Sequence, residues 1–161
     1  MLCSGSARWL VLALFFTLLG APAVAAADPL DLGNSHACAI AADGSVQCWG
    51  DGDYGRLGDG GEEETSRPVR AIGLTSATDV SAGYEHSCAT TADGKAFCWG
   101  AGSYGRLGNG GDGDIYAPRE VTGLTDALDI DAGEDHTCAA TKAGEVFCWG
   151  DNGNGEIGDG P

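Results

Sequence analysis

Short runs of β-branched, aromatic and small residues, separated by Gly, Asp and Asn, make up the chain after residue 27. Apolar residues do not recur at the three- and four-residue steps that mark an amphipathic helix. Runs of this kind are typical of many short strands. One unit reads as an edge strand over residues 68–72, followed by strands over 78–83, 86–91 and 96–100. The pattern therefore predicts an all-β fold.

One segment occurs three times at a step of fifty residues, starting at His36, His86 and His136. Each copy reads Gly-x-x-His-x-Cys, then a Gly-containing turn, then Cys-Trp-Gly. Four strands in a repeat of about fifty residues are typical of a β-propeller blade. We expect a repeat domain over residues 28–161, with repeats at about 28–77, 78–127 and 128–161, the last one truncated.

The hairpin turn of each copy predicts which cysteines face each other. A three-residue loop with Gly44 in the left-handed conformation pairs Ala41 with Ser45. Opposed Cβ atoms lie about 4.5–5.5 Å apart and a disulfide prefers about 3.5–4.5 Å, so the closer, non-hydrogen-bonded type of pair is needed. Disulfide formation is the favoured interpretation. Counting outward from the turns gives three pairs, Cys38–Cys48, Cys88–Cys98 and Cys138–Cys148.

A histidine two residues before a cysteine in each copy offers a metal site as the alternative. The ten-residue offset between the cysteines is not a structural zinc spacing, and a fourth ligand is missing. We expect each histidine to be a hydrogen-bonded structural residue between blades, and each repeated tryptophan to pack there. No cofactor, metal or catalytic residue is predicted.

Residues 1–27 have the features of a secretory signal peptide. Arg8 precedes an apolar run over residues 9–19, and three alanines at 25–27 provide a cleavage site. The run is shorter than the roughly twenty residues that cross a bilayer, so we expect no membrane insertion after cleavage; an uncleaved anchor is the alternative. Cleavage removes Cys3 and leaves six cysteines, which suits an oxidising compartment. The predicted location is secreted: extracellular, cell-surface or periplasmic.

The charge of the chain narrows the choice of partner. Without Arg8, seven basic and twenty-four acidic side chains remain, a net charge of −17. This charge argues against nucleic acid and anionic membrane as partners. Two explanations of the negative charge remain open. It keeps a secreted chain soluble, or it attracts a basic partner.

The repeated residues resemble the repeat of the regulator of chromosome condensation (RCC1) family. The shared pattern is Gly-x-x-His-x-Cys-Ala, Gly-x-Val-x-Cys-Trp-Gly and Tyr-Gly-Arg-Leu-Gly-x-Gly, and the cysteine pairs are similar to a secreted, disulfide-bearing branch. The resemblance implies RCC1-like β-propeller blades, about two and a half to three four-stranded repeats of 50 residues in an incomplete ring.

The family's propeller has seven blades, which would need about 350 residues. The chain is therefore expected to be a fragment; association between chains, including self-association through open blade edges, and a persistent open arc are the alternatives. The founding member is a nucleotide-exchange factor for a small nuclear GTPase and binds chromatin. Its exchange surface lies outside the repeat motif, so no exchange residue can be carried over to this chain.

Two segments differ most between the copies, residues 61–67 and 111–117, and binding is expected where a repeated scaffold varies. Loop drift without function is the alternative. The predicted function is a non-catalytic, secreted or cell-surface scaffold that binds an unidentified protein. Guanine-nucleotide exchange and an extracellular carbohydrate-active enzyme are the alternatives. The candidate contact residues are Glu62, Glu63, Glu64, Arg67, Ile115 and Tyr116.

Overall fold

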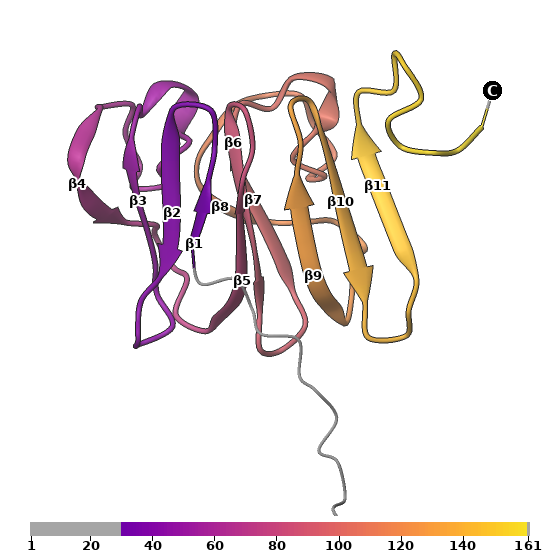
Figure 1. Cartoon of the computed structure of the whole chain (residues 1–161), viewed down its shortest axis with the longest axis horizontal. Coiled ribbons are helices and arrows are strands. Elements are labelled where there is room, and N and C mark those ends of the chain that lie inside the picture. Colours follow the sequence, from indigo (N-terminus) through magenta and orange to yellow (C-terminus); the bar gives the residue numbers. More distant parts are fainter. Residues whose placement is uncertain (1–29, 161) are drawn as a thin grey trace, which may run out of the picture.

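The computed structural model describes residues 30–160, and the expected signal peptide lies outside them. Three antiparallel sheets stand side by side, each built from strands that are consecutive in the chain (Figure 1). Blade 1 contains β1 (Leu30–Leu32), β2 (His36–Ile40), β3 (Val46–Gly50) and β4 (Thr65–Arg70). Blade 2 contains β5 (Ala77–Ala82), β6 (His86–Thr91), β7 (Ala96–Gly100) and β8 (Ile115–Glu120). Blade 3 contains β9 (Ala127–Ala132), β10 (His136–Thr141) and β11 (Val146–Gly150).

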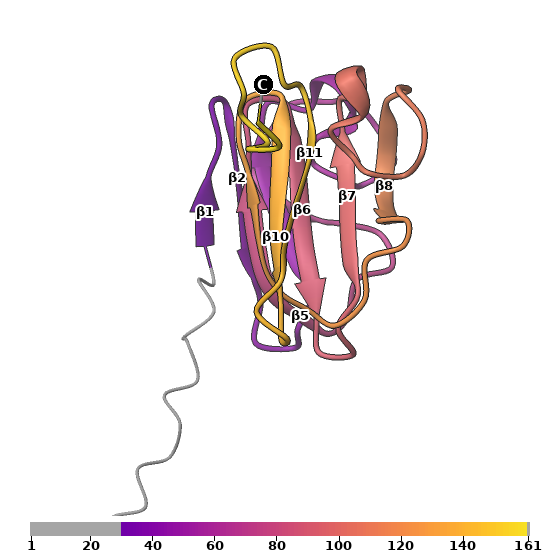
Figure 2. The same cartoon turned by 90° about the vertical axis from the view of Figure 1, so that its right-hand side faces the viewer.

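The first strands of the blades, β1, β5 and β9, form one side of the molecule, and β8 lies on the other (Figure 2). We call β1, β5 and β9 the inner strands, and hydrogen bonds from side chains link them across the blade boundaries. The carboxylate of Asp31 accepts a hydrogen bond from the N–H of Ala82 at 2.8 Å, and the Ser81 hydroxyl oxygen accepts one from the N–H of Ala132 at 3.1 Å. The inner strands are therefore joined without a continuous sheet.

The hairpin register predicted from the turns is confirmed. Gly44 has a φ of 76°, and the N–H of Ala41 donates to the carbonyl of Ser45 at 2.8 Å. Gly94 and Gly144 take the same conformation, with φ of 81° and 83°. Because successive pairs alternate along an antiparallel ladder, the cysteines fall at non-hydrogen-bonded positions.

The edge strand differs from its prediction in two respects. It runs over Thr65–Arg70 instead of 68–72, and it pairs with β3, so it completes the preceding blade and does not start the next one. Pro68 lies within the strand. A proline is tolerated there because β4 is the outer edge of its sheet, where one missing N–H leaves no ladder bond unmade. The sequence predicts that the strand starts at the proline, and it starts at β-branched Thr65.

Two hydrophobic clusters hold the blades together. The first lies between blades 1 and 2 and contains Leu57 and Trp99, which have no exposed surface. The second lies between blades 2 and 3 around Leu107. Within residues 30–160 the three blades do not close a ring, because blades 1 and 3 lie at opposite ends of the row (Figure 1). No helix within residues 30–160 is long and apolar enough to span a membrane.

Candidate functional site

Two side-chain hydrogen bonds between blades 1 and 2 converge on one main-chain carbonyl, that of Arg56. It accepts from the Ser87 hydroxyl and from the Trp99 indole N–H, both at 2.9 Å. The Ser87 oxygen lies 2.8 Å from Nε2 of His36. Because the hydroxyl proton points at the carbonyl, His36 donates to Ser87, and its proton sits on Nε2. The structural role expected for the histidine and the tryptophan is confirmed at this junction.

Blades 2 and 3 repeat this junction network, here defined as histidine, hydroxyl, arginine carbonyl and tryptophan. His86 lies 2.8 Å from the Thr137 hydroxyl, which donates to the carbonyl of Arg106 at 2.8 Å. The Trp149 indole donates to the same carbonyl at 2.8 Å. These repeated residues are therefore engaged in holding one blade to the next.

Both histidines of the junction networks are neutral near pH 7. Burial, with a smaller contribution from the Arg56 charge, lowers the pKa of His36 to about 4. Burial and the Arg106 charge lower the pKa of His86 to about 3. The Nδ1 atoms of both rings are buried without a hydrogen-bond partner, so protonation there would place an unsolvated charge between two blades.

The six cysteines form the three expected pairs, Cys38–Cys48, Cys88–Cys98 and Cys138–Cys148. In each pair the Cα atoms are 4.1 Å apart, the short separation of a non-hydrogen-bonded pair. Within residues 30–160 no group of His, Cys, Asp or Glu side chains is arranged to hold a metal ion.

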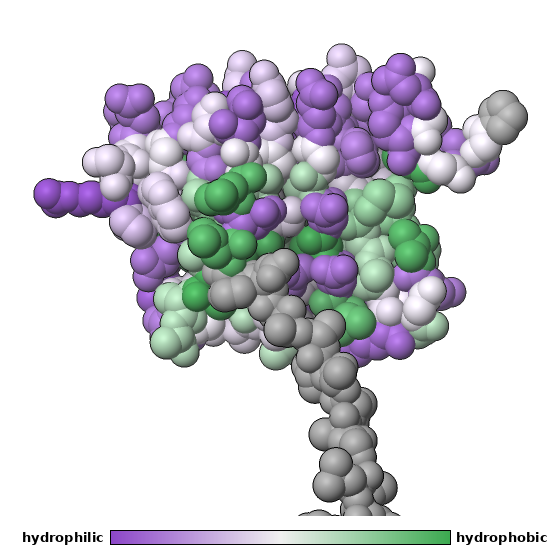
Figure 3. Space-filling view, in the orientation of Figure 1, coloured by the Kyte–Doolittle hydropathy of each residue, from purple (hydrophilic) through white to green (hydrophobic). Residues whose placement is uncertain are grey.

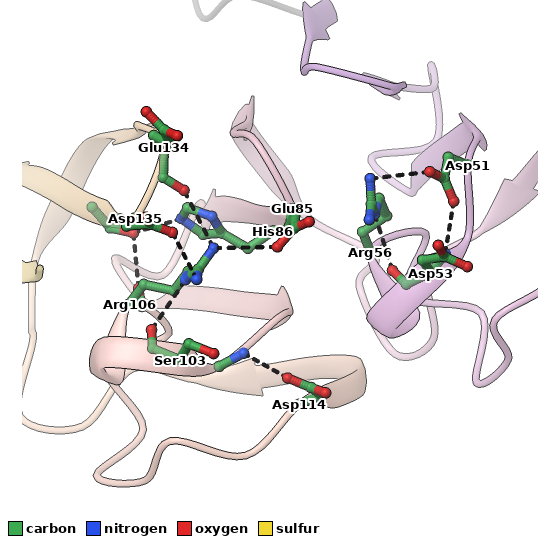
Figure 4. A network of polar contacts seen from close by, with 12 residues as sticks. Asp51, Asp53, Arg56, Glu85, His86, Ser103, Arg106, Asp114, Glu134 and Asp135 are labelled. Atoms are coloured by element: carbon green, nitrogen blue, oxygen red, sulfur yellow. Dashed lines mark hydrogen bonds and ion pairs between the residues drawn. The ribbon is translucent and has the colours of Figure 1, made fainter.

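The loops that follow β3 and β7 each bury one arginine side chain (Figure 4). Arg56 pairs with Asp51 of its own blade at 3.4 Å. Arg106 pairs with Glu85 of its own blade at 3.9 Å and, across the blade boundary, with Asp135 at 2.7 Å. Both positively charged side chains of the two loops are therefore already paired with carboxylates.

One end of the blades, here called the loop face, carries most of the exposed negative charge. It is formed by residues 33–35, 51–64, 83–85, 101–114, 133–135 and 151–160, and lies at the top of Figure 3, where hydrophilic residues line the rim. Its only basic residues are the two buried arginines. Its fourteen carboxylates belong to Asp51, Asp53, Asp59, Glu62, Glu63, Glu64, Glu85, Asp112, Asp114, Glu134, Asp135, Asp151, Glu156 and Asp159.

The two divergent segments meet at the edge of this face, where β8 begins, although fifty residues separate them in the chain. The N–H of Gly60 donates to the carbonyl of Tyr116 at 2.9 Å. The Tyr116 hydroxyl lies beside Glu62, and the hydrogen bond to that carboxylate and its charge raise the pKa of the Tyr116 phenol. Exposed Glu62, Glu63, Glu64 and Tyr116 form what we call the Glu62–Tyr116 patch.

Three of the candidate contact residues lie in strands and not in loops; Tyr116 is exposed on β8, and the other two are Arg67 and Ile115. Arg67 is exposed, but it belongs to β4 and not to a loop. Ile115 opens β8, is half-buried and packs against both hydrophobic clusters, so it is not exposed on a loop. An aliphatic residue next to a glycine-rich stretch gave no sign that it would reach back to the neighbouring blade.

Sequence reasoning missed the exposed tyrosines of the loop face. Tyr54 and Tyr104 have left-handed φ angles of 61° and 62°, a conformation that costs a bulky residue about 1 kcal/mol or more. The guanidinium groups of Arg56 and Arg106 lie 5.6 and 6.0 Å from the centres of these rings. The repeated Tyr-Gly-Arg motif was the available signal. All four tyrosines of the chain, Tyr54, Tyr84, Tyr104 and Tyr116, lie on or beside this face and are at least 40% exposed.

Comparison with protein families identifies the repeat. The model of the regulator of chromosome condensation (RCC1) repeat matches residues 43–90 and 93–140, more than half of the chain. The chain belongs to the RCC1 repeat family. A second model of the RCC1 repeat matches residues 77–106 and 128–156. No curated protein matches the chain by sequence.

Several solved structures share the fold. Human WBSCR16 is 26% identical, with a TM-score of 0.69 over 75% of this chain and 32% of that protein. Yeast RCC1 (Prp20), solved bound to Kap60, is 20% identical, with a TM-score of 0.72 over 84% of this chain and 34% of that one. Prp20p from Saccharomyces cerevisiae, studied together with its binding to Gsp1p and histones, is 22% identical in a further structure, with a TM-score of 0.68 over 82% of this chain and 34% of that one. The chain thus spans about a third of the length of these proteins.

Proposed function

We propose that this RCC1-repeat chain is a secreted or cell-surface scaffold that binds a basic partner protein through its loop face and catalyses no reaction. The N-terminal sequence and the three disulfides support an oxidising location. Two four-stranded blades and one three-stranded blade supply the platform, and the segments that vary between copies lie at one end of it.

The observation that carries this proposal is the charge of the loop face. Its carboxylates face solvent in large part, whereas its two arginine side chains are only 3–4% exposed and already paired. Such a surface attracts lysine- and arginine-rich partners and speeds their association. The exposed tyrosines add flat aromatic surface on which cationic side chains can stack.

The Glu62–Tyr116 patch is the expected centre of the contact, because both divergent segments contribute to it. A random peptide library displayed on phage provides a probe that assumes no partner. We expect selected peptides to be rich in Lys and Arg, and their binding to weaken as salt is raised. The variant Glu62→Gln/Glu63→Gln/Glu64→Gln/Tyr116→Ala should bind them at least about tenfold more weakly, the equivalent of about 1.4 kcal/mol.

A matched control removes the same charge away from the loop face, as Glu120→Gln/Asp126→Asn/Glu145→Gln. These residues are exposed, at the far end of β8 and in the turns opposite the loop face. The control should keep nearly full binding. Equal weakening in the two variants would mean that net charge alone governs binding, and the proposed surface would be wrong.

Guanine-nucleotide exchange is the competing function, because the RCC1 scaffold is shared with Prp20. A nucleotide-release assay with small GTPases distinguishes the two. Accelerated release by the purified chain would replace the binding-scaffold proposal.

A further inference from the structure

The chain holds two of its own arginines in the same way, each against a tyrosine ring and a carboxylate. In blade 1 the guanidinium of Arg56 lies 5.6 Å from the centre of the Tyr54 ring and pairs with Asp51 at 3.4 Å. In blade 2 the guanidinium of Arg106 lies 6.0 Å from the centre of the Tyr104 ring. Its nearest carboxylate is at 2.7 Å (Figure 4). A guanidinium is attracted to the electron-rich face of an aromatic ring and can bond to a carboxylate at the same time.

Tyr116 and Glu62 form a third tyrosine–carboxylate pair, at the boundary between blades 1 and 2. The Tyr116 hydroxyl lies beside the Glu62 carboxylate and donates a hydrogen bond to it. Both side chains are exposed. Within residues 30–160, no basic side chain lies over the Tyr116 ring or forms an ion pair with Glu62. The pair therefore presents to solvent the same combination of groups that holds Arg56 and Arg106 elsewhere in the molecule.

The loop of blade 1 holds the Tyr116 ring in place. Gly55 contacts the ring so closely that a side chain there would begin 2.7 Å from the ring atom Cδ1. The main-chain carbonyl of Tyr116 accepts a hydrogen bond from the N–H of Gly60 at 2.9 Å. A surface that is already ordered loses little conformational entropy when it binds a partner. Both blades that contribute to the pair have all four strands, so its exposure is not that of an incomplete blade.

The surroundings of the pair favour a cation, and its geometry favours arginine over lysine. Glu63 and Glu64 are exposed beside Glu62, and the negative charge of Asp114 also acts on the Tyr116 phenol. Because hydrogen bonds polarise their partners, a phenol that donates to a carboxylate becomes a better acceptor for a cation over its ring. A guanidinium is flat, stacks on an aromatic face and forks toward a carboxylate, whereas a lysine ammonium is a compact, strongly hydrated charge.

We propose that Tyr116 and Glu62 together bind one arginine side chain of the partner protein. The guanidinium stacks on the exposed part of the Tyr116 ring and forms hydrogen bonds to the Glu62 carboxylate, as Arg56 and Arg106 do with their own tyrosines and carboxylates. This inference rests on the function proposed above and makes it more specific. An arginine, and not merely a positive charge, anchors the contact.

Two synthetic peptides of equal charge provide the probe, Lys-Gly-Arg-Gly-Lys and Lys-Gly-Lys-Gly-Lys, each acetylated and amidated at its ends. NMR titration of the purified, isotope-labelled wild-type protein measures both affinities. We expect the arginine peptide to bind about fivefold more tightly than the lysine peptide. The amide signals of Gly55 and Gly60 should shift, because both residues contact Tyr116. Equal affinities, or no saturable binding of the arginine peptide, would overturn the arginine site.

Substitutions in the protein locate the preference for arginine. Tyr116→Leu removes the ring and Glu62→Gln removes the charge, and each should bring the two affinities to within about twofold of each other. Matched controls lie on blade 3: Phe147→Leu removes an exposed aromatic ring, and Glu145→Gln neutralises an exposed carboxylate. Both controls should keep the preference. A preference that survives both substitutions in the pair, or that the controls lose equally, would place the arginine elsewhere and overturn the site.

The outcomes distinguish this inference from the function on which it rests. Suppose that the two peptides bind equally well and that both lose affinity when Glu62, Glu63 and Glu64 are replaced by Gln. The arginine site would then be overturned, and the surface for a basic partner would stand. Phage-selected peptides that are rich in Lys and lack Arg would lead to the same conclusion. Selected peptides that are not basic would overturn both proposals.

Discussion

The two blade junctions have the same hydrogen-bond network and different ion pairs. At both, a histidine donates to a hydroxyl, and this hydroxyl and a tryptophan donate to an arginine carbonyl. The arginine side chains diverge. Arg56 pairs within its own blade, whereas Arg106 reaches across to Asp135 of the next one.

This difference shows which part of the repeat the fold requires. The network uses the main-chain carbonyl of the arginine, so the side chain is free to change partners. The third copy lacks both side chains: Asn154 replaces the tyrosine and Glu156 replaces the arginine. The network and the disulfides define the scaffold, whereas the charged side chains of the loop face differ from one repeat to the next.

Removing the tryptophans should give the largest contrast between the junctions. Trp99→Ala leaves a cavity in a closed junction and should cost about 3–5 kcal/mol of unfolding free energy. Trp149→Ala should cost about half as much, because its junction is already open to solvent on one side. Denaturant unfolding of both variants measures the difference. Equal losses would contradict a closed first junction and an open second one.

Acid should weaken both junctions through their histidines. The folded-state pKa values of about 4 for His36 and about 3 for His86 lie below the usual 6.5. The unfolded chain therefore binds more protons as the pH falls below 6.5, and unfolding free energy should drop by up to about 1.4 kcal/mol per pH unit for each histidine. The loss should continue to lower pH for His86, which is the more deeply buried of the two.

Asp79 acts in the opposite direction and has to be separated from this effect. Burial raises its pKa to about 6, so its protonated form stabilises the fold in acid and that contribution is lost as pH rises through 6. Unfolding should be followed against pH in the wild type, in His86→Gln and in Asp79→Asn. His86→Gln should flatten the slope below pH 6.5, and a slope unchanged by that substitution would rule out the buried histidine as its source.

The arginine side chains should give the smallest contrast. Arg106→Met removes an ion pair across the blade boundary and should cost about 1 kcal/mol, since the partner carboxylates are about a third exposed. Arg56→Met should cost less, because its only ion pair lies within one blade. Thermal unfolding at low and high salt measures both, and high salt should reduce the difference. A larger loss at Arg56 would reverse the ranking.

Much of the scaffold could be predicted from the sequence because it depends on local geometry. The turn at Gly44 determines the hairpin register, and the register determines that Cys38 faces Cys48. The fifty-residue step then carries the result to the other two blades. The roles of His36 and Trp99 followed from their recurrence, since one residue per unit in a constant context is typical of contacts between units.

The candidate surface was harder to predict because it depends on contacts between blades. Nothing local to Ile115 shows that it packs on the neighbouring cluster, or that Tyr116 binds Gly60 of another blade. The pairing of Thr65–Arg70 with the preceding hairpin is of the same kind. Such contacts depend on how the blades stack, and the sequence of a single repeat does not determine that packing.

The junction network also makes the two faces of a blade chemically different. A histidine always faces forward along the chain, and a hydroxyl receives it on the following blade. Ala37 occupies in blade 1 the position that Ser87 and Thr137 occupy in blades 2 and 3. A blade docked in front of blade 1 would present its imidazole to a methyl group. Stacking of these units consequently has a direction, and copies of this chain joined head to tail would lack the hydroxyl link at every seam.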